Sequence, residues 1–319
     1  GKLEYEFYEW LRDNKYKGTL LCDDIWYFKG MRNNFWYKIP SKYKEDITHL
    51  GHWSGTGLIE FDDDVVEEPN WTVVTAYFDL TAQQDASAEI KSHPFEYYLE
   101  SAIPTLSVEQ NLVVFCEPQY LERIKQKRPE WLQSRTLYIT MEFKDFPLNQ
   151  YYDKIAQNRI RNPPHDSRNT ISYYLFCMAR CSMLKKVIDY NIFNSTHFAW
   201  MNFCIERMGW KNLRYMNDVF KENRDLFSTC HIDYQPPENT SIVIRNGWCT
   251  LCSGFYTGNK KYMYEVCDKM EKKFVYYVDR GLGHADEQIM NAVYQDHPEL
   301  FDVYYGDYHQ MITNYCVVR

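Results

Sequence analysis

The chain has 319 residues, of which 45% are hydrophobic and 25% charged, a composition typical of one large or two modest globular domains. Its 36 basic residues are outnumbered by 44 acidic ones, for a formal net charge of −8, and no long basic run is present. Binding to nucleic acid is therefore not expected. No apolar stretch approaches the roughly 20 residues of a membrane-spanning helix, so we expect no membrane span.

The ten cysteines are scattered through hydrophobic segments such as YYLFCMARCSML. That distribution indicates reduced thiols and a cytoplasmic protein, although the sequons at Asn194 and Asn239 point weakly the other way. The chain begins at Gly1, so we expect a trimmed chain or one part of a longer polypeptide. Its 28 tyrosines, 18 phenylalanines and 9 tryptophans are expected mainly in the core, with some free to stack on sugars or bases.

Residues 1–68 form a first block. GTLLCDDIWYF predicts a short strand that runs into Asp23 and Asp24, and HLGHWSGTGLIEF predicts a turn followed by a strand. The acidic run 62–64 and the Glu67-Glu68-Pro69 triplet predict a linker. Because the block is too short for a substantial core, it either docks on the rest of the chain or is the tail of an upstream domain.

Residues 69–319 form the main predicted domain, in which strands and helices alternate. This pattern favours an α/β fold with a mainly parallel central sheet flanked by helices. The predicted strands are TVVTAYFDL, NLVVFCE, TLYITMEF, THFAWMNFCI, SIVIRNGWCTLCSGFYTG with its turn, and the start of FDVYYGDYH. The predicted helices lie in HPFEYYLESAIPTL, PQYLERIKQKR, the segment after Lys144, residues 170–191, KKYMYEVCDKMEKKFVYYVDRG and ADEQIMNAVYQDHPELF.

Four residues in this pattern are candidates for a role in binding or catalysis. Arg180 lies among apolar neighbours on the helix 170–191, so its guanidinium needs either a ligand phosphate or an internal carboxylate. Asp286 and Glu287 open a helix, where a carboxylate can serve as a general base but is also favoured for purely local reasons. Asp79 follows the first strand, at the edge where open α/β sheets bind ligands.

From Trp71 onward the chain resembles the HtrL/YibB-like family, in the form carried by giant viruses. The resemblance covers about 250 residues and rests on TVVTAYFDL, NLVVFCEP, the Arg180 helix, NIFNSTHFAWMNFCIERMG, CSGFYTGN, GHADEQ and YYGDYHQMITNY. It implies a GT-A-like glycosyltransferase (a hexosyltransferase) that uses a UDP-sugar, first UDP-glucose, with Mn²⁺ or Mg²⁺. It also implies a glycan or glycoprotein acceptor, for example glycosylated hydroxylysine of a collagen-like viral protein.

The resemblance extends to individual residues. Asn202 stands where the family commonly carries a metal-binding Asp, and a neutral amide oxygen is a weaker ligand than a carboxylate. The remaining implied roles are Asp307 and His309 for metal, Asp286 and Glu287 for catalysis, Thr75, Ala76, Tyr77 and Asp79 for nucleoside, Arg180 for diphosphate, and Ser253 and Gly254 beside the acceptor. Trp200, Trp248 and Tyr256 are further candidates for stacking on sugar.

Two other interpretations stay open. Asn202 favours a catalytically silent sugar-binding or scaffold module with the same fold. Cys249 and Cys252 have zinc or redox spacing, but no second such pair follows them. The oligomeric state, the stereochemistry of transfer and the role of residues 1–68 cannot be predicted from the sequence.

Overall fold

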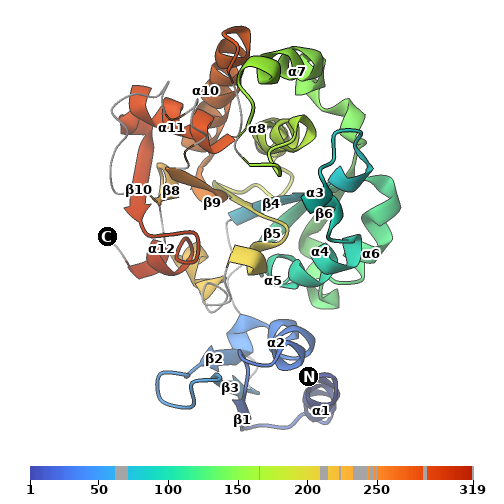
Figure 1. Ribbon diagram of the computed structural model, residues 1–319. Helices are drawn as coiled ribbons and strands as arrows, with labels where there is room; N and C mark the ends of the chain where they lie inside the picture. The colour runs from blue at the N-terminus through green and yellow to red at the C-terminus, as the bar shows by residue number, and fades with distance from the viewer. Residues whose placement is uncertain are drawn as a thin grey trace.

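The computed structural model describes residues 1–61, 71–164, 166–208, 215–222, 224–232, 243, 248, 250–282 and 286–317. The expected linker, the sequon at Asn239, and Cys249 of the cysteine pair lie outside these residues. Figure 1 shows a small N-terminal part and a larger α/β part, which are joined through the segment between residues 61 and 71.

The larger part is built on a seven-stranded sheet. In spatial order its strands are β10 (Phe301–Tyr305), β8 (Phe227–His231), β9 (Leu251–Asn259), β7 (His197–Met201), β4 (Trp71–Tyr77), β5 (Asn111–Cys116) and β6 (Thr136–Thr140). Strand β9 is antiparallel to β7 and β8, and the other neighbouring pairs are parallel. The predicted α/β class with a mainly parallel sheet is therefore confirmed.

The strand order reverses between β4 and β7. The chain runs outward from β4 to β5 and β6, then returns to place β7 on the opposite side of β4. In open α/β sheets the connections leave such a switch point in opposite directions, and ligands bind there at the carboxyl ends of the strands. In this sheet that position is occupied by the residues that follow β4 and β7.

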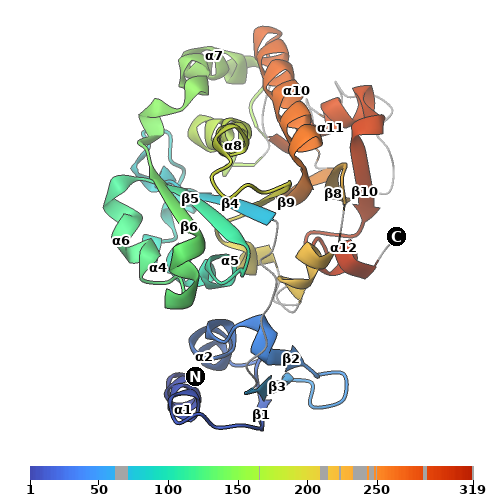
Figure 2. The same ribbon diagram turned by 180° about the vertical axis from the view of Figure 1, so that it is seen from behind.

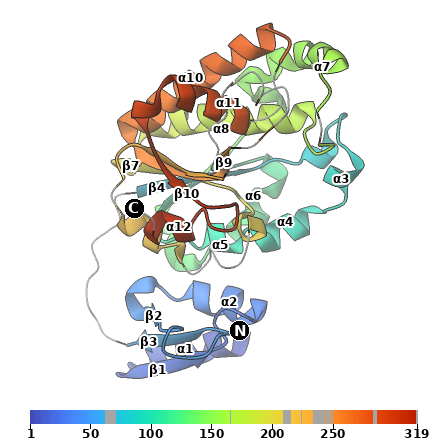
Figure 3. The same cartoon turned by 60° about the vertical axis from the view of Figure 1, so that its left-hand side comes forward.

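Helices cover both faces of the sheet, and alternate strand residues supply the two hydrophobic clusters between them (Figure 3). One face carries α7 (Tyr152–Arg161), α8 (Ile171–Tyr190), α10 (Lys260–Asp279) and α11 (Asp286–Asp296). The other carries α4 (Phe95–Ser101), α5 (Ile103–Leu106), α6 (Leu121–Lys125) and α12 (Thr313–Val317), and the short α3 (Ala88–Lys91) precedes α4. Strands β4 and β5 are buried along their whole length, as expected of continuous apolar runs.

Helix α8 matches its predicted limits. The Thr170 hydroxyl caps its first turn by accepting a hydrogen bond from the Tyr173 amide at 3.1 Å, and Asn191 ends it in the left-handed conformation at φ 35°. Figure 2 shows α8 and α10 side by side, an arrangement supported by the ion pair of Lys185 and Glu271. Among the described residues no helix is both long and apolar enough to cross a bilayer.

The N-terminal part contains α1 (Lys2–Asp13), β1 (Thr19–Asp23), α2 (Lys29–Asn34), β2 (Lys44–Asp46) and β3 (Thr56–Glu60). Its three strands form an antiparallel sheet in the order β1-β3-β2. The strands β1 and β3 were predicted, whereas α1 was not. Ile25, Ile39 and Ile59 are fully buried, so this block has a small core of its own.

The block also docks on the larger part. Arg32 Nη2 lies 2.7 Å from Glu206 Oε1, Lys29 Nζ lies 3.3 Å from the same oxygen, and Trp131 Nε1 donates to the Lys38 carbonyl at 2.9 Å. Arg32 is almost fully buried, so this contact excludes water. The boundary at residue 68 stays a prediction, because the linker residues are not described.

Two features of the sheet differ from the sequence-based expectation. No strand was predicted between THFAWMNFCI and SIVIRNGWCTLCSGFYTG, yet the chain forms β8 there, whose sequence FSTCH mixes apolar and hydroxyl residues. The antiparallel course of β9 was not predicted, because strand composition carries no direction. The nine cysteines in the described part of the chain are free thiols.

Candidate functional site

A buried ion pair links α8 to the start of α11. Arg180 Nη1 lies 3.0 Å from Asp286 Oδ2, and each residue is 4% exposed. The same nitrogen donates to the Ser253 hydroxyl at 3.2 Å and to the Ser253 carbonyl at 3.3 Å. Of the two partners expected for Arg180, the structure places the internal carboxylate beside it. Asp286 is correspondingly held away from solvent.

Glu287, the next residue along α11, is only half-buried. Its Oε1 accepts a hydrogen bond from the Tyr308 hydroxyl at 2.7 Å and a longer one from the Ser253 hydroxyl at 3.4 Å. Neighbouring carboxylates on one helical turn therefore have different environments: Asp286 pairs with a buried guanidinium, whereas Glu287 accepts hydrogen bonds from the hydroxyls of Tyr308 and Ser253. Of the two predicted catalytic residues, Glu287 is the one with access to a reactant.

Asn202 directly follows β7, at the switch point. Its Oδ1 accepts a hydrogen bond from Trp200 Nε1 at 3.1 Å, and its backbone amide donates to the Gly254 carbonyl at 2.8 Å. A Cβ on Gly254 would lie 3.3 Å from Asn202 Nδ2 and 3.2 Å from Met311 Sδ. The glycine thus lets the ends of β7 and β9 and the turn before α12 approach one another.

Asp79, beyond the end of β4, caps a short 3₁₀ turn instead of ending a strand. One carboxylate oxygen accepts from the Thr81 amide at 2.9 Å and the other from the Tyr120 hydroxyl at 2.6 Å. The Asp79 amide donates to Glu117 Oε2 at 2.7 Å, and Glu117 is 6% exposed. Burial raises the pKa of Glu117 above its usual value, with a further contribution from the Asp79 charge.

Thr75, Ala76 and Tyr77 were expected to contact the nucleoside. They are 0%, 3% and 6% exposed, because β4 lies in the middle of the sheet and both of its faces are covered. Their side chains offer no surface to a ligand in this structure. The same correction applies to Trp200 and Tyr256 as sugar-stacking surfaces, since each is 1% exposed, whereas Trp248 is 52% exposed.

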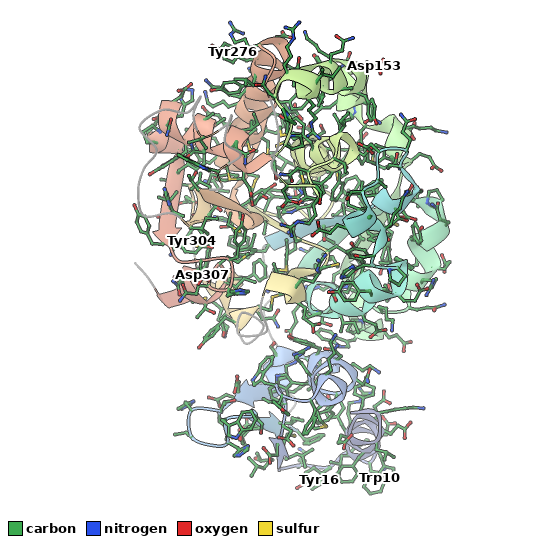
Figure 4. All side chains as sticks on the ribbon, viewed as in Figure 1. Trp10, Tyr16, Asp153, Tyr276, Tyr304 and Asp307 are labelled. Carbon is green, nitrogen blue, oxygen red and sulfur yellow. The ribbon has the colours of Figure 1, made fainter. Side chains whose placement is uncertain are left out.

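Asp307 and His309 lie in the turn after β10, and both are exposed. Figure 4 labels Asp307 near Tyr304, the buried tyrosine at the end of β10. The Asp307 carboxylate accepts a hydrogen bond from the His309 amide at 2.7 Å. This local turn directs the Asp307 oxygen to the backbone.

The expected metal ligands do not form a ready site. Asn202 Oδ1 is engaged by Trp200, and Asp307 Oδ1 by the backbone. Over the described ranges, the one group of three or more His, Cys, Asp or Glu side chains that converges within 4.8 Å is Asp23, Asp24 and His52, in the N-terminal block. In this structure one oxygen of Asn202 and one of Asp307 accept hydrogen bonds from the protein, and the assignment of these residues as metal ligands stays a prediction.

Sequence reasoning missed two site residues, Tyr308 and Tyr173. Tyr308 lies in the YYGDYH motif, but only Asp307 and His309 of that motif were predicted as site residues. The pKa of Tyr173 lies well above its usual value, because the Cys177 thiol and burial raise it and the charges of Asp286 and Glu287 add to the effect. Tyr173 lies outside the apolar face that defined the helix, so no periodic signal marked it.

A family model described as "Bacterial protein of unknown function (HtrL_YibB)" matches residues 69–316. No curated protein matches the chain significantly.

Three solved structures share a distant likeness in fold. Mouse xyloside xylosyltransferase 1 in its apo form is 12% identical, over 73% of this chain and 84% of that one, with a TM-score of 0.38. A 4-diphosphocytidyl-2C-methyl-D-erythritol synthase from Anaerococcus prevotii is 11% identical over 76% and 89%, with a TM-score of 0.36. Core-mannan synthase A from Aspergillus fumigatus, in a Mn/GDP form, is 9% identical over 76% and 74%, with a TM-score of 0.41. At such scores the likeness carries no argument about activity.

Proposed function

The chain belongs to the HtrL_YibB family, and within it we propose that this protein is a glycosyltransferase that moves a sugar from a UDP-sugar to a hydroxyl group of a glycan or glycoprotein. The donor that we propose to test first is UDP-glucose. The acceptors to test first are neutral glycans and glycosylated hydroxylysine in a collagen-like chain.

The observation that carries the proposal is the half-buried carboxylate of Glu287 beside the switch point of the sheet. The segment after β10 and the start of β9 bring Tyr308 and Ser253 to this carboxylate, and Asn202 pairs with the next residue of that strand, since its amide donates to the Gly254 carbonyl. Ligands of open α/β folds bind at this edge. A half-buried carboxylate at this edge can accept a proton from a reacting hydroxyl group.

In the proposed reaction Glu287 acts as the general base. The acceptor oxygen attacks the anomeric carbon, and the bond from that carbon to the phosphate oxygen breaks. The leaving UDP takes the electron pair, while the acceptor proton passes to Glu287. The Tyr308 hydroxyl, 2.7 Å from Oε1, fixes the orientation of the carboxylate.

Arg180 and Asp286 are positioning residues in this proposal. Their ion pair fixes the first turn of α11, from which Glu287 extends, and Arg180 holds Ser253 at the start of β9. Burial of the guanidinium leaves it no open approach to a diphosphate. In this proposal the contact with the diphosphate is therefore not assigned to Arg180.

We include Mn²⁺ in the proposal only as a cation that would bind together with the donor. A divalent cation would neutralise charge on the diphosphate, and no step is derived from it.

The test is a transfer assay with UDP-glucose, which measures both UDP release and glucosylated acceptor. We expect Glu287→Gln to lower kcat by at least about 100-fold, the usual contribution of a general base, with little change in KM for the donor. The matched control is Glu299→Gln, an exposed glutamate just beyond the far end of α11, which should keep full activity. Unchanged turnover in Glu287→Gln would refute the assigned role.

A second function, a silent sugar-binding module, is favoured by one observation. Asn202 stands at the strand end with its amide oxygen engaged by Trp200 Nε1. If the protein is such a module, it should bind sugar or nucleotide without turnover. Glu287→Gln would then change neither the binding affinity nor the absent turnover. The two candidates therefore differ in the same assay.

A further inference from the structure

The N-terminal block presents a second surface of unusual composition. Tyr27, Phe28 and Trp53 are 60%, 53% and 64% exposed. Their rings contact edge to face, with centroids 5.0 Å apart for Tyr27 and Phe28 and 4.9 Å apart for Tyr27 and Trp53. Large aromatic rings that gather on a surface in this way mark an interaction site more often than single exposed residues do.

The rings project from a fixed base. The Ser54 carbonyl accepts hydrogen bonds from the amides of Trp26 at 3.0 Å and Tyr27 at 2.9 Å, and the Gly55 carbonyl accepts one from Ile25 at 3.1 Å. Trp26 is 3% exposed, and its Nε1 donates to Asp46 at 2.8 Å. The two segments that carry the exposed rings are thereby joined, so a ligand would bind without first ordering them.

Polar groups lie at the border of these rings. Ligand atoms of Asp23, Asp24 and His52 lie within 4.8 Å of one another, and the His52 ring centroid is 5.4 Å from that of Trp53. The Ser54 hydroxyl holds His52 Nδ1 at 2.6 Å. Carboxylates accept hydrogen bonds, and an imidazole can donate or accept them, so the group suits a ligand with several hydroxyls.

We propose that this aromatic surface, made of Tyr27, Phe28 and Trp53 with Asp23, Asp24 and His52, binds a neutral glycan. The apolar C–H face of a sugar ring would stack on an exposed aromatic ring, while its hydroxyls donate to the two carboxylates. Phosphate-bearing partners are disfavoured, because Asp23 and Asp24 would repel nucleic acid or an anionic lipid surface. A neutral polyhydroxylated chain satisfies both the rings and the carboxylates.

The aromatic surface is linked through Lys29 to the segment that follows β7. Lys29 follows Phe28 directly and lies 3.3 Å from Glu206. Glu206 comes four residues after Asn202, a stretch that spans at most about 14 Å. Glycan binding stands without the proposed function, whereas delivery of that glycan as the acceptor rests on it.

The experiment uses the full chain and a set of neutral oligosaccharides, four to six units of glucose, mannose, galactose or xylose, measured by calorimetry. At least one is expected to bind, and Trp53→Ala and Tyr27→Ala should each weaken it by about tenfold or more, with the Tm unchanged. The matched control is Trp10→Ala, because Trp10 is 58% exposed in the same block but lies on α1 (Figure 4). This control should bind as the parent chain does. Asp24→Asn should weaken binding, and EDTA should not.

Three results would overturn the inference: no binding of any oligosaccharide, equal weakening by Trp10→Ala, or preferential binding of heparin or of vesicles that contain anionic lipid. Loss of binding in EDTA would overturn the direct contact between carboxylates and hydroxyls. UDP binding by Trp53→Ala, measured in parallel, separates the two proposals. It should stay unchanged, since the aromatic surface includes no residue assigned to the donor.

Discussion

Arg180 and Asp286 illustrate how one buried pair can organise a site. Taking either charge out of water is costly, and the pair is tolerated because each group neutralises the other at 3.0 Å. Arg180 is also enclosed by the rings of Phe176 and Trp200, whose centroids lie 5.4 Å and 5.2 Å from its guanidinium carbon. The pair is therefore expected to fix geometry and to contribute little net stability.

Breaking this pair should be strongly destabilising. Arg180→Met leaves Asp286 buried without a counter-charge, so we expect a loss of about 3–5 kcal/mol in the free energy of unfolding, measured by urea denaturation. The double variant Arg180→Met with Asp286→Leu should recover most of that loss. Lys154→Met removes an exposed pair with Asp279 and should cost at most about 1 kcal/mol. A loss in Arg180→Met no larger than in that control would contradict the interpretation.

Glu117 gives the site edge a pH dependence. Its pKa in the folded chain is raised by burial, so the folded state binds its proton more tightly than the unfolded state does. Its contribution to stability is therefore present below the unfolded pKa and is lost as the pH rises through the folded pKa.

We accordingly expect Glu117→Gln to raise the Tm at pH 8 and to leave it nearly unchanged at pH 4, as scanning calorimetry would measure. A glutamine can still accept the hydrogen bond of the Asp79 amide. The exposed Glu130→Gln should change the Tm at neither pH. A variant that is less stable at pH 8 than at pH 4, relative to the parent chain, would reverse the expected sign.

At the scale of elements, the start of β9 joins the parts of the site. The strand brings Ser253 to Arg180 and Glu287, and its glycine at 254 lets Asn202 and Met311 approach the backbone. Methionine can shift at little cost, whereas Asn202 is held by Trp200 and by its own amide. A methyl group at position 254 would therefore press on the Asn202 side-chain amide, which its own hydrogen bonds hold in place.

Gly254→Ala should weaken UDP binding by about tenfold, equivalent to about 1.4 kcal/mol, while the fold persists. The control lies in the same strand: a Cβ on Gly258 meets nothing closer than 3.4 Å, so Gly258→Ala should bind UDP as the parent chain does. Equal effects of the two variants on calorimetric UDP affinity would show that the strand, and not the contact with Asn202, matters.

At the scale of the whole molecule, the sequence predicted the features that depend on local residue patterns, namely individual strands, helices and strand ends. The apolar runs of β4, β5 and β7 and the spacing along α8 identified these elements, and strand ends located Asn202 and Asp79. Pairing across distance was not predictable. Arg180 and Asp286 are 106 residues apart, and no pattern in either segment reveals that they meet.

The same reason explains the other differences. Strand β8 was missed because its hydroxyl residues weaken the apolar signal, although Ser228 and Thr229 are fully buried by neighbours supplied from elsewhere in the chain. Thr75, Ala76 and Tyr77 were expected at a binding surface because they approach a strand end. Their burial results from helices packed on both faces of β4, a property of the assembled layers.

The central proposal is a site for a uridine nucleotide at the switch point between β4 and β7. The most direct measurement is a calorimetric titration of the full chain with UDP and with GDP, each in Mn²⁺ and again in EDTA. We predict micromolar binding of UDP in Mn²⁺, much weaker binding in EDTA, and a clear preference for UDP over GDP. Absence of binding by either nucleotide, in the presence of the metal, would contradict the proposed site.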